Sequence, residues 1–180
     1  MDSGQLRALQ APLKSRYKDD PGAAIVTLRA RGTLDDSHIA CKVETGRALA
    51  VAGLHPATGG SGAELCSGDM LLEALAACAG VTLKAVATAL DIPLRAGVVT
   101  VEGDLDFRGT LGVAKEAPVG FVEIRLAFEL DTDAPPEKLD SLIRLTERYC
   151  VVLQTLAKPP KLAVQVEAKS SSQSDATRAT

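Results

Sequence analysis

The chain contains four cysteines, and these are the side chains with the most evident capacity for chemistry. They are Cys41, Cys66, Cys78 and Cys150, and no two of them form a C-x-x-C motif. Four cysteines in 180 residues are too few for a disulfide-stapled scaffold, so disulfides do not define this fold. A pair of cysteines that meet in the folded chain would instead indicate redox chemistry.

A metal site is the second possibility. His38 and Cys41 form one H-x-x-C pair, and Asp36, Glu44 or Cys66 are conceivable further ligands. Catalytic zinc usually takes at least three protein ligands, and this segment has no recognisable spacing for them. We therefore expect no metal and no other cofactor.

Two segments have the hydrophobic period of buried helices, and each carries a cysteine on its apolar stripe. The first helix is predicted over residues 69–90 with Cys78 on its stripe, and the second from 137 to about 156 with Cys150 on its stripe. Two helices in a small core pack through such stripes, so a facing thiol pair is geometrically possible. The alternative is that both cysteines act only as small apolar side chains, as buried free cysteines often do.

Short runs of β-branched and alternating residues predict the strands around these helices. They are residues 24–30, 38–43, 47–52, 98–108, 121–130 and 161–168. The pair 98–108 and 121–130 alternates along its whole length, which predicts an antiparallel hairpin with one wet face. A Gly-rich loop, 53–67, precedes the first helix. The sum is an α+β fold with antiparallel sheets packed on two core helices.

Both ends of the chain differ from the middle. Residues 1–22 are expected to form an N-terminal arm with a short helix, and residues 170–180 a disordered tail rich in Ser and Thr. Residues 23–169 then make up one domain, a length that can bury a core.

The composition excludes several classes of protein. A pI near 5.4 and the lack of any basic block leave no electrostatic footprint for nucleic acid. The sequence contains no run of about 18 uncharged apolar residues, so no segment is predicted to span a membrane. The first residues are polar and contain no apolar signal region, so we expect a cytoplasmic protein that binds neither nucleic acid nor membranes.

Three segments together resemble the OsmC/Ohr superfamily. They are residues 66–78 (CSGDMLLEALAAC), 98–106 (VVTVEGDLD) and 147–156 (ERYCVVLQTL). The similarity extends over residues 24–168 in the order that the family has. The resemblance implies an intertwined homodimer with active sites at the subunit interface, and a thiol peroxidase that reduces organic hydroperoxides or hydrogen peroxide.

The resemblance also implies roles for the cysteines. Cys78 would attack the peroxide as a thiolate and become a sulfenic acid, and Cys150 would condense with it to a disulfide. A dithiol reductant, of lipoyl or thioredoxin-like type, would then reduce that disulfide. Cys66, in the loop before the helix, is a rival resolving thiol, whereas Cys41 is expected to serve packing.

A reactive thiol on an apolar helix face needs a nearby cation, because burial raises the pKa of the thiol. In the family an arginine from the first strands supplies it, held by a carboxylate that precedes the helix. Arg31 is the best placed by order, with Arg29 and Arg47 as alternatives. The family's glutamate position, ten residues before the reactive cysteine, is Gly68 here. The adjacent Asp69 either orients the arginine or, like Ser67, only caps the helix.

The segment after the second cysteine departs from the family pattern as well. Val151 stands where the family usually has proline, and Leu153 and Gln154 replace its polar and basic pair. These departures keep a second hypothesis open. In it the chain is a non-enzymatic member with inert cysteines, and a largely apolar pocket at the dimer interface binds a hydrophobic small ligand.

Overall fold

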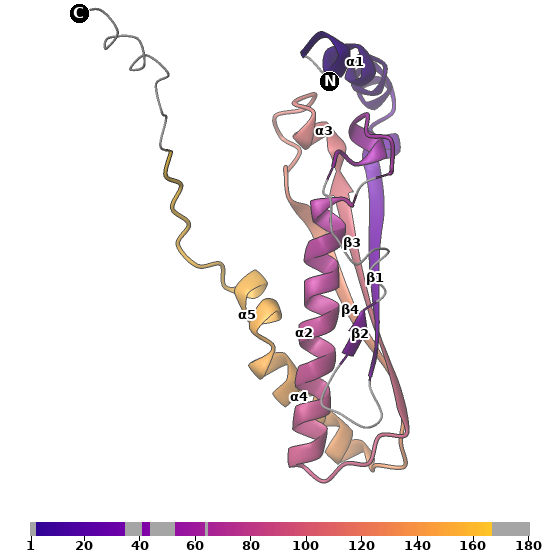
Figure 1. Cartoon of the computed structure of the whole chain (residues 1–180), viewed down its shortest axis with the longest axis vertical. Helices are drawn as coiled ribbons and strands as arrows, with labels where there is room; N and C mark the ends of the chain where they lie inside the picture. Colours follow the sequence, from indigo (N-terminus) through magenta and orange to yellow (C-terminus); the bar gives the residue numbers. More distant parts are fainter. Residues whose placement is uncertain (1–2, 35–40, 44–52, 64, 167–180) are drawn as a thin grey trace, which may run out of the picture.

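The structure is a computed structural model that describes residues 3–34, 41–43, 53–63 and 65–166. Helices and strands are both present, which confirms the predicted α+β class (Figure 1). In chain order the elements are α1 (Ser3–Asp19), η1 (Pro21–Ala24), β1 (Ile25–Leu34), β2 (Cys41–Val43), η2 (Pro56–Thr58), α2 (Ser67–Ala89), β3 (Ala96–Asp106), α3 (Phe107–Thr110), β4 (Phe121–Asp131), α4 (Pro136–Tyr149) and α5 (Val151–Ala157).

The four described strands form one antiparallel sheet in the order β2-β1-β3-β4. The predicted hairpin is confirmed: β3 and β4 pair from Ala96↔Asp131 onwards, with a register irregularity between Asp104 and Leu105. On β3 the buried and less buried residues alternate, as expected for a sheet with only one covered face.

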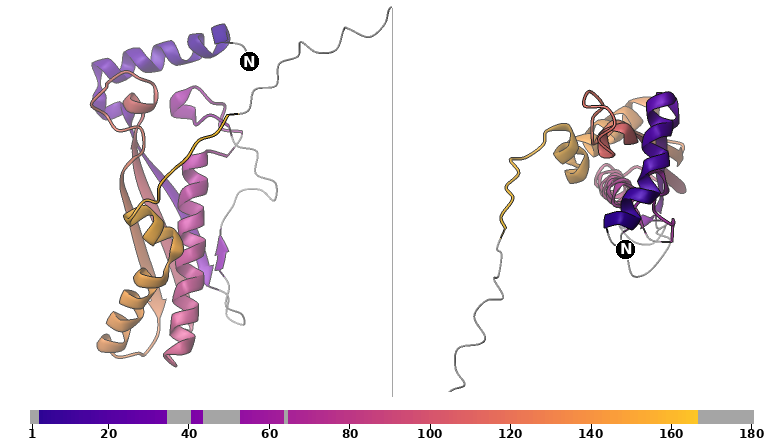
Figure 2. Two further views of the ribbon diagram at one scale, coloured as in Figure 1. Left: turned by 90° about the vertical axis from the view of Figure 1, so that its left-hand side faces the viewer. Right: turned by 90° about the horizontal axis from the view of Figure 1, so that it is seen from above.

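Helix α2 lies along the covered face of the sheet and forms the centre of the core. Its Leu72, Leu75 and Leu83 are fully buried, as are Val99 and Val101 on β3. Among the described helices, α2 alone has the length and apolar composition to cross a membrane, a test that core helices of globular proteins also pass. Figure 2 shows the sheet along one side of α2, with α4 and α5 along another.

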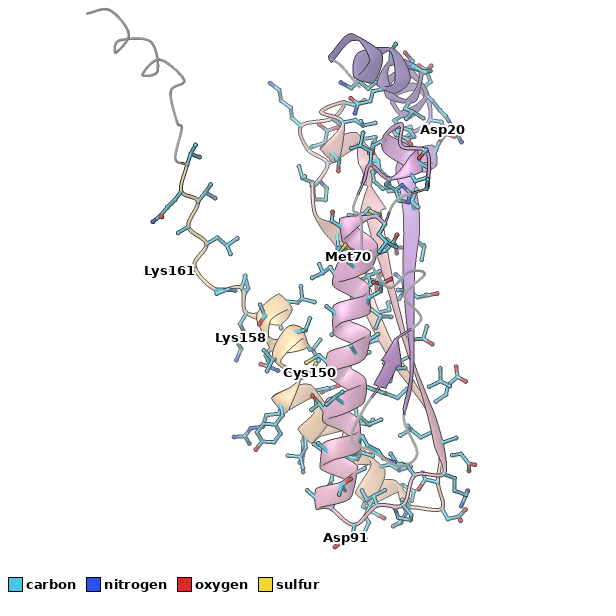
Figure 3. The ribbon with its side chains drawn as sticks, viewed as in Figure 1. Asp20, Met70, Asp91, Cys150, Lys158 and Lys161 are labelled. Atoms are coloured by element: carbon cyan, nitrogen blue, oxygen red, sulfur yellow. The ribbon has the colours of Figure 1, made fainter. Side chains whose placement is uncertain are left out.

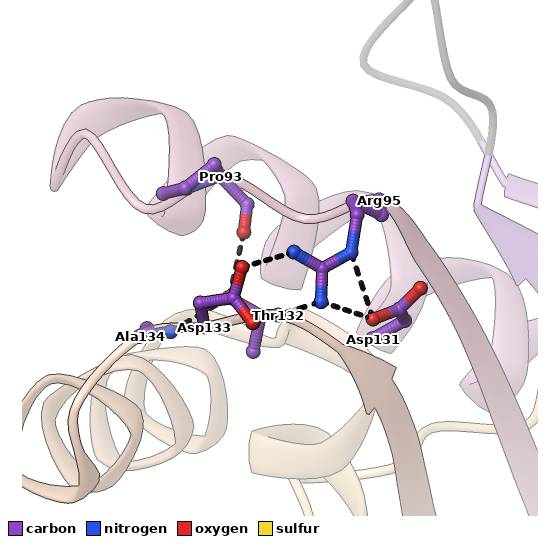
Figure 4. Close-up of polar contacts among 6 residues, drawn as sticks. All are labelled: Pro93, Arg95, Asp131, Thr132, Asp133 and Ala134. Carbon is purple, nitrogen blue, oxygen red and sulfur yellow. Dashed lines mark hydrogen bonds and ion pairs between the residues drawn. The ribbon is translucent and has the colours of Figure 1, made fainter.

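The turn between α2 and β3 is tied to the connection between β4 and α4 (Figure 4). The Arg95 guanidinium donates to Asp131 at 2.9 Å and forms an ion pair with Asp133. The Thr132 hydroxyl donates to the Pro93 carbonyl at 2.6 Å. These contacts join the start of β3 to the end of β4. After β4 the chain continues into α4, which packs against α2.

The predicted second helix is interrupted, so the expectation that Cys150 lies within a helix is wrong. α4 ends at Tyr149 and α5 begins at Val151, and Cys150 between them is extended, with φ −69° and ψ 104°. The Cys150 N–H still donates to Thr146, and its carbonyl still accepts from Gln154, both at 2.9 Å. These two bonds keep the four-residue spacing of an α-helix. The hydrophobic period of the sequence therefore continues through Cys150, and the sequence pattern does not indicate the break between the two helices.

The predicted last strand is also wrong over residues 161–166, which have no regular structure; residues 167–168 lie outside the described part of the chain. Leu162, Val164 and Val166 are each more than 85% exposed. Alternation indicates a strand only where a neighbouring strand is present to pair with it, and within the described chain none is.

Other boundaries differ in smaller ways. The strand expected to reach residue 108 ends at Asp106, because the Asp106 carboxylate accepts the Arg108 N–H at 3.0 Å and starts the short helix α3. The first strand continues to Leu34. The strand prediction at 47–52 and the tail 170–180 lie outside the described residues.

Candidate functional site

The structure brings the two cysteines of the predicted pair together. Cys78 lies in the middle of α2 and is partly exposed, whereas Cys150 is 0% exposed. The Cys78 side chain lies close enough to the Cys150 thiol to affect its pKa. Figure 3 shows Cys150 at the joint between α4 and α5, beside α2. Both are free cysteines here, so the site is a reduced dithiol.

The surroundings of Cys150 keep its thiol protonated. Burial is the largest cause and, with the neighbouring Cys78, raises the pKa of Cys150 from 9.0 to about 11. The backbone N–H groups of Leu153 and Val152, at the start of α5, oppose this rise in the pKa. The two thiols are therefore unequal: Cys78 is accessible from outside, and Cys150 is buried and a poor nucleophile near neutral pH.

Asp69 is not part of this dithiol. It lies in the first turn of α2, nine residues before Cys78, which corresponds to about 13 Å along the helix axis. Burial raises the pKa of Asp69, and the nearby His55 opposes that rise. The predicted cap is wrong as well: Cys66 occupies the cap position, and no described side chain, Ser67 and Asp69 included, caps the helix start.

The arginine candidates are placed only by their backbone. Arg31 lies in β1 opposite Thr100 of β3, and Arg29 lies opposite Glu102. Their side chains, like that of Cys41, fall outside the described part, as does the whole of Arg47. The role of Arg31 therefore stays a prediction.

A pocket at the amino-terminal end of α2 is the feature that the sequence did not reveal. It has a volume of about 410 Å³. Its lining residues are Gly53, Leu54, His55, Thr58, Cys66, Ser67, Gly68, Leu71, Leu105, Phe107, Thr110, Val119, Gly120 and Phe121. The only signal for it in the sequence was the long Gly-rich loop 53–67, which supplies one wall.

Cys66 belongs to this pocket and not to the dithiol. It precedes Cys78 by twelve residues at the start of α2, a separation of about 18 Å along the helix. This distance leaves Cys150 as the described partner of Cys78. Among the described residues, no group of three or more His, Cys, Asp or Glu side chains could hold a metal ion. His38 lies outside that part of the chain.

Comparison with protein families identifies the class to which the chain belongs. Residues 60–165 match the family described as OsmC-like protein. The match spans more than half of the chain, and the chain therefore belongs to the OsmC-like family. No curated protein sequence matches the chain at a significant level.

Solved structures share the same fold. One is an OsmC-like hydroperoxide resistance protein from Jannaschia sp. CCS1, with a TM-score of 0.58 and 19% identity over 81% of this chain and 95% of that one. Another is an OsmC-like protein from Mycoplasma pneumoniae, with a TM-score of 0.52 and 18% identity over 75% of this chain and 86% of that one. At these identities the likeness concerns the fold.

Proposed function

We propose that the protein is a thiol peroxidase that reduces organic hydroperoxides, with Cys78 as the attacking thiol and Cys150 as the resolving thiol. The observation that carries this proposal is that Cys78 and Cys150, which come from distant parts of the sequence, are neighbours where α2 packs against α4 and α5. Membership of the OsmC-like family agrees with hydroperoxide chemistry, as does the likeness in fold to the hydroperoxide resistance protein from Jannaschia.

The unequal exposure of the two thiols supports this assignment of roles. A peroxide must reach the sulfur that it oxidises, and of the pair only Cys78 is partly exposed. The Cys78 thiolate attacks a peroxide oxygen, the O–O bond breaks, and an S–O bond forms. The leaving alkoxide takes a proton and departs as the alcohol. Sulfur is thereby oxidised by two electrons to a sulfenic acid, and the peroxide is reduced.

Cys150 completes the reaction without a large movement, because its sulfur already lies beside Cys78. Its thiolate attacks the sulfenic sulfur, and hydroxide leaves and is protonated to water. The resulting disulfide is reduced by a dithiol, of lipoyl or thioredoxin-like type, through two exchange steps. We place this cycle in the cytoplasm, where such reductants keep thiols reduced.

We further propose that the working unit is a homodimer. The apolar helix α2 is not fully covered in one chain, and Val81, close to Cys78 along the helix, is 39% exposed. A second copy over this face would shield the sulfenic acid from water. Arg31 is the proposed activating cation, so Arg31→Ala should slow oxidation of Cys78 by at least about tenfold, as expected for a lost thiolate-stabilising charge.

The proposal is tested by counting thiols before and after one equivalent of cumene hydroperoxide, with intact-mass detection. Above pH 9, where the Cys150 thiol begins to ionise, we expect loss of two thiols and a mass decrease of about two daltons, the signature of one disulfide. Peptide mapping should identify Cys78 and Cys150 as its members.

Two variants separate this chemistry from nonspecific oxidation. Cys78→Ser should abolish this loss of thiols, whereas Cys150→Ser should leave a sulfenic acid that dimedone traps. Cys66→Ser is the matched control, since Cys66 lies apart from the dithiol, and it should react like the unmodified chain. Four free thiols after prolonged exposure would refute the peroxidase proposal and favour the non-enzymatic alternative.

A further inference from the structure

The pocket at the amino-terminal end of α2 is separate from the dithiol. Leu71 is the lining residue closest in sequence to Cys78, and it lies two helical turns away, about 10 Å along the axis. The pocket volume of about 410 Å³ falls within the range typical of small-molecule sites, about 300–1,000 Å³. A site this far along the helix needs an explanation other than attack on peroxide.

The lining combines an apolar body with a few polar groups, the composition typical of ligand pockets. The apolar part comes from four separate parts of the chain: the loop before α2, α2 itself, the end of β3 with α3, and the start of β4. Its larger side chains are Leu54, Leu71, Leu105, Phe107, Val119 and Phe121. Such a surface favours an aliphatic or aromatic ligand body, because burial removes apolar surface from water.

The walls of the pocket are held in place without a ligand. The His55 ring stacks on Phe107 with centroids 4.8 Å apart and 15° between the planes. Behind His55, the Tyr17 hydroxyl of α1 donates to the Ala57 carbonyl at 2.8 Å, and the Gln10 amide donates to the Thr58 carbonyl at 3.3 Å. A preformed pocket binds without first ordering its walls, which favours affinity.

Some of the polar groups that line the pocket can donate hydrogen bonds to a ligand, and the Asp69 carboxylate, which lies near His55, is not among the lining residues. His55 Nδ1 accepts the Ala57 N–H at 3.0 Å, which places the hydrogen of the neutral ring on Nε2. Burial lowers the pKa of His55, so the neutral ring predominates near pH 7. Ser67 and Gly68 line the pocket from the first turn of α2, where no described side chain caps the free N–H groups. Such a turn favours an acceptor, and an anion most of all.

We propose that this pocket is a second binding site, for a small compound with an apolar body and a hydrogen-bond-accepting head group of the carboxylate type. The apolar body would lie against Leu71, Leu105 and Phe121, and the head group would accept from the first turn of α2 and from His55. This site is independent of the proposed peroxidase chemistry, since it contains neither Cys78 nor Cys150.

Cys66 provides a local reporter, because it is a free, partly exposed cysteine in the pocket wall. The experiment measures the rate at which iodoacetamide alkylates each cysteine of the full chain, resolved by peptide mass mapping, with and without octanoate. At ten times its dissociation constant a ligand occupies about 90% of its sites, so alkylation of Cys66 should slow about tenfold. Alkylation of Cys78 should stay within about twofold of its rate without octanoate, since its site is not occupied.

Octylamine is the control for the head group. It has the same apolar chain as octanoate and a cationic end, which the donors at the pocket cannot satisfy, so it should leave the Cys66 rate unchanged. Equal protection by octylamine would overturn the acceptor assignment. No protection by octanoate up to its solubility limit would overturn the site itself.

Two valines form a matched pair for the location. Val119 lines the pocket and is 67% exposed, whereas Val122 is 57% exposed and is not among the lining residues. Because both are exposed, neither change to tryptophan costs core packing, and circular dichroism should confirm both folds. Val119→Trp should weaken octanoate binding at least fivefold, and Val122→Trp should not. Equal weakening in both variants would overturn the placement. Cys66 protection that persists unchanged in Val119→Trp would do the same.

Discussion

Closure of the Cys78–Cys150 disulfide should depend steeply on pH, because Cys150 must ionise before it can attack. Its pKa is raised from 9.0 to about 11, and burial is the largest cause. The prediction assumes that Cys150 stays as buried in the sulfenic acid state as it is in the reduced dithiol. Two pKa units reduce the thiolate fraction at pH 7 about 100-fold compared with an ordinary thiol. The rate of closure should therefore rise about tenfold for each pH unit from 7 to 10.

The assay follows the sulfenic acid directly. One equivalent of cumene hydroperoxide is added at a series of pH values, dimedone is added at successive times, and intact mass distinguishes the dimedone adduct from the disulfide. Below pH 7 we expect the adduct to dominate, and above pH 9 the disulfide. Cys150→Ser is the control, in which the adduct should form at every pH because no resolving thiol remains.

One result would refute the reasoning. If closure proceeds at the same rate at pH 7 and pH 9, Cys150 is already ionised at neutral pH. The burial seen in this structure would then not describe the oxidised state, and the two cysteines would have to separate or become hydrated before they join.

Three substitutions test the fold that positions the site. Gly103→Ala should destabilise by about 1–3 kcal/mol in urea unfolding, since a Cβ there would lie 2.5 Å from the Phe121 ring; Gly120→Ala, with nothing within 4 Å, is its control, and equal effects would contradict this. Leu142→Ala, in a fully buried position, should cost about 2–5 kcal/mol and lower the rate of disulfide closure; a smaller cost would mean that α4 packs loosely. Arg95→Ala should leave the urea midpoint of unfolding almost unchanged, because the ion pairs of Arg95 are exposed. A large decrease in the midpoint would mean that these ion pairs do stabilise the fold.

Hydrophobic period alone was sufficient for the main elements. Residues 69–90 and 121–130 were predicted within two residues of α2 and β4, because the stripes and the alternation extend over many turns and pleats. The joint at Cys150 was missed for a related reason, since hydrogen bonds to Thr146 and from Gln154 preserve the helical spacing across it. A pattern that depends on spacing cannot register a break that leaves the spacing intact.

The candidate site was predicted in part. Cys78 and Cys150 were placed on segments that could pack together, and in the structure the two side chains are neighbours, while their proposed roles stay a prediction. Asp69 was assigned to a helix cap or to an arginine, and its neighbour in the structure is His55. That neighbour comes from a loop without any periodic pattern, so no local signal related the two residues.

The sequence by itself determined the main helices and strands and, through its two cysteine segments, the family to which the chain belongs. These properties depend on residue type and on neighbours a few positions away. Only the tertiary structure decided that Cys150 is buried beside Cys78, that Cys66 lies in a separate pocket, and that residues 161–166 lack a pairing strand. Each of these depends on which surfaces meet when distant segments pack, and spacing along the chain does not encode that.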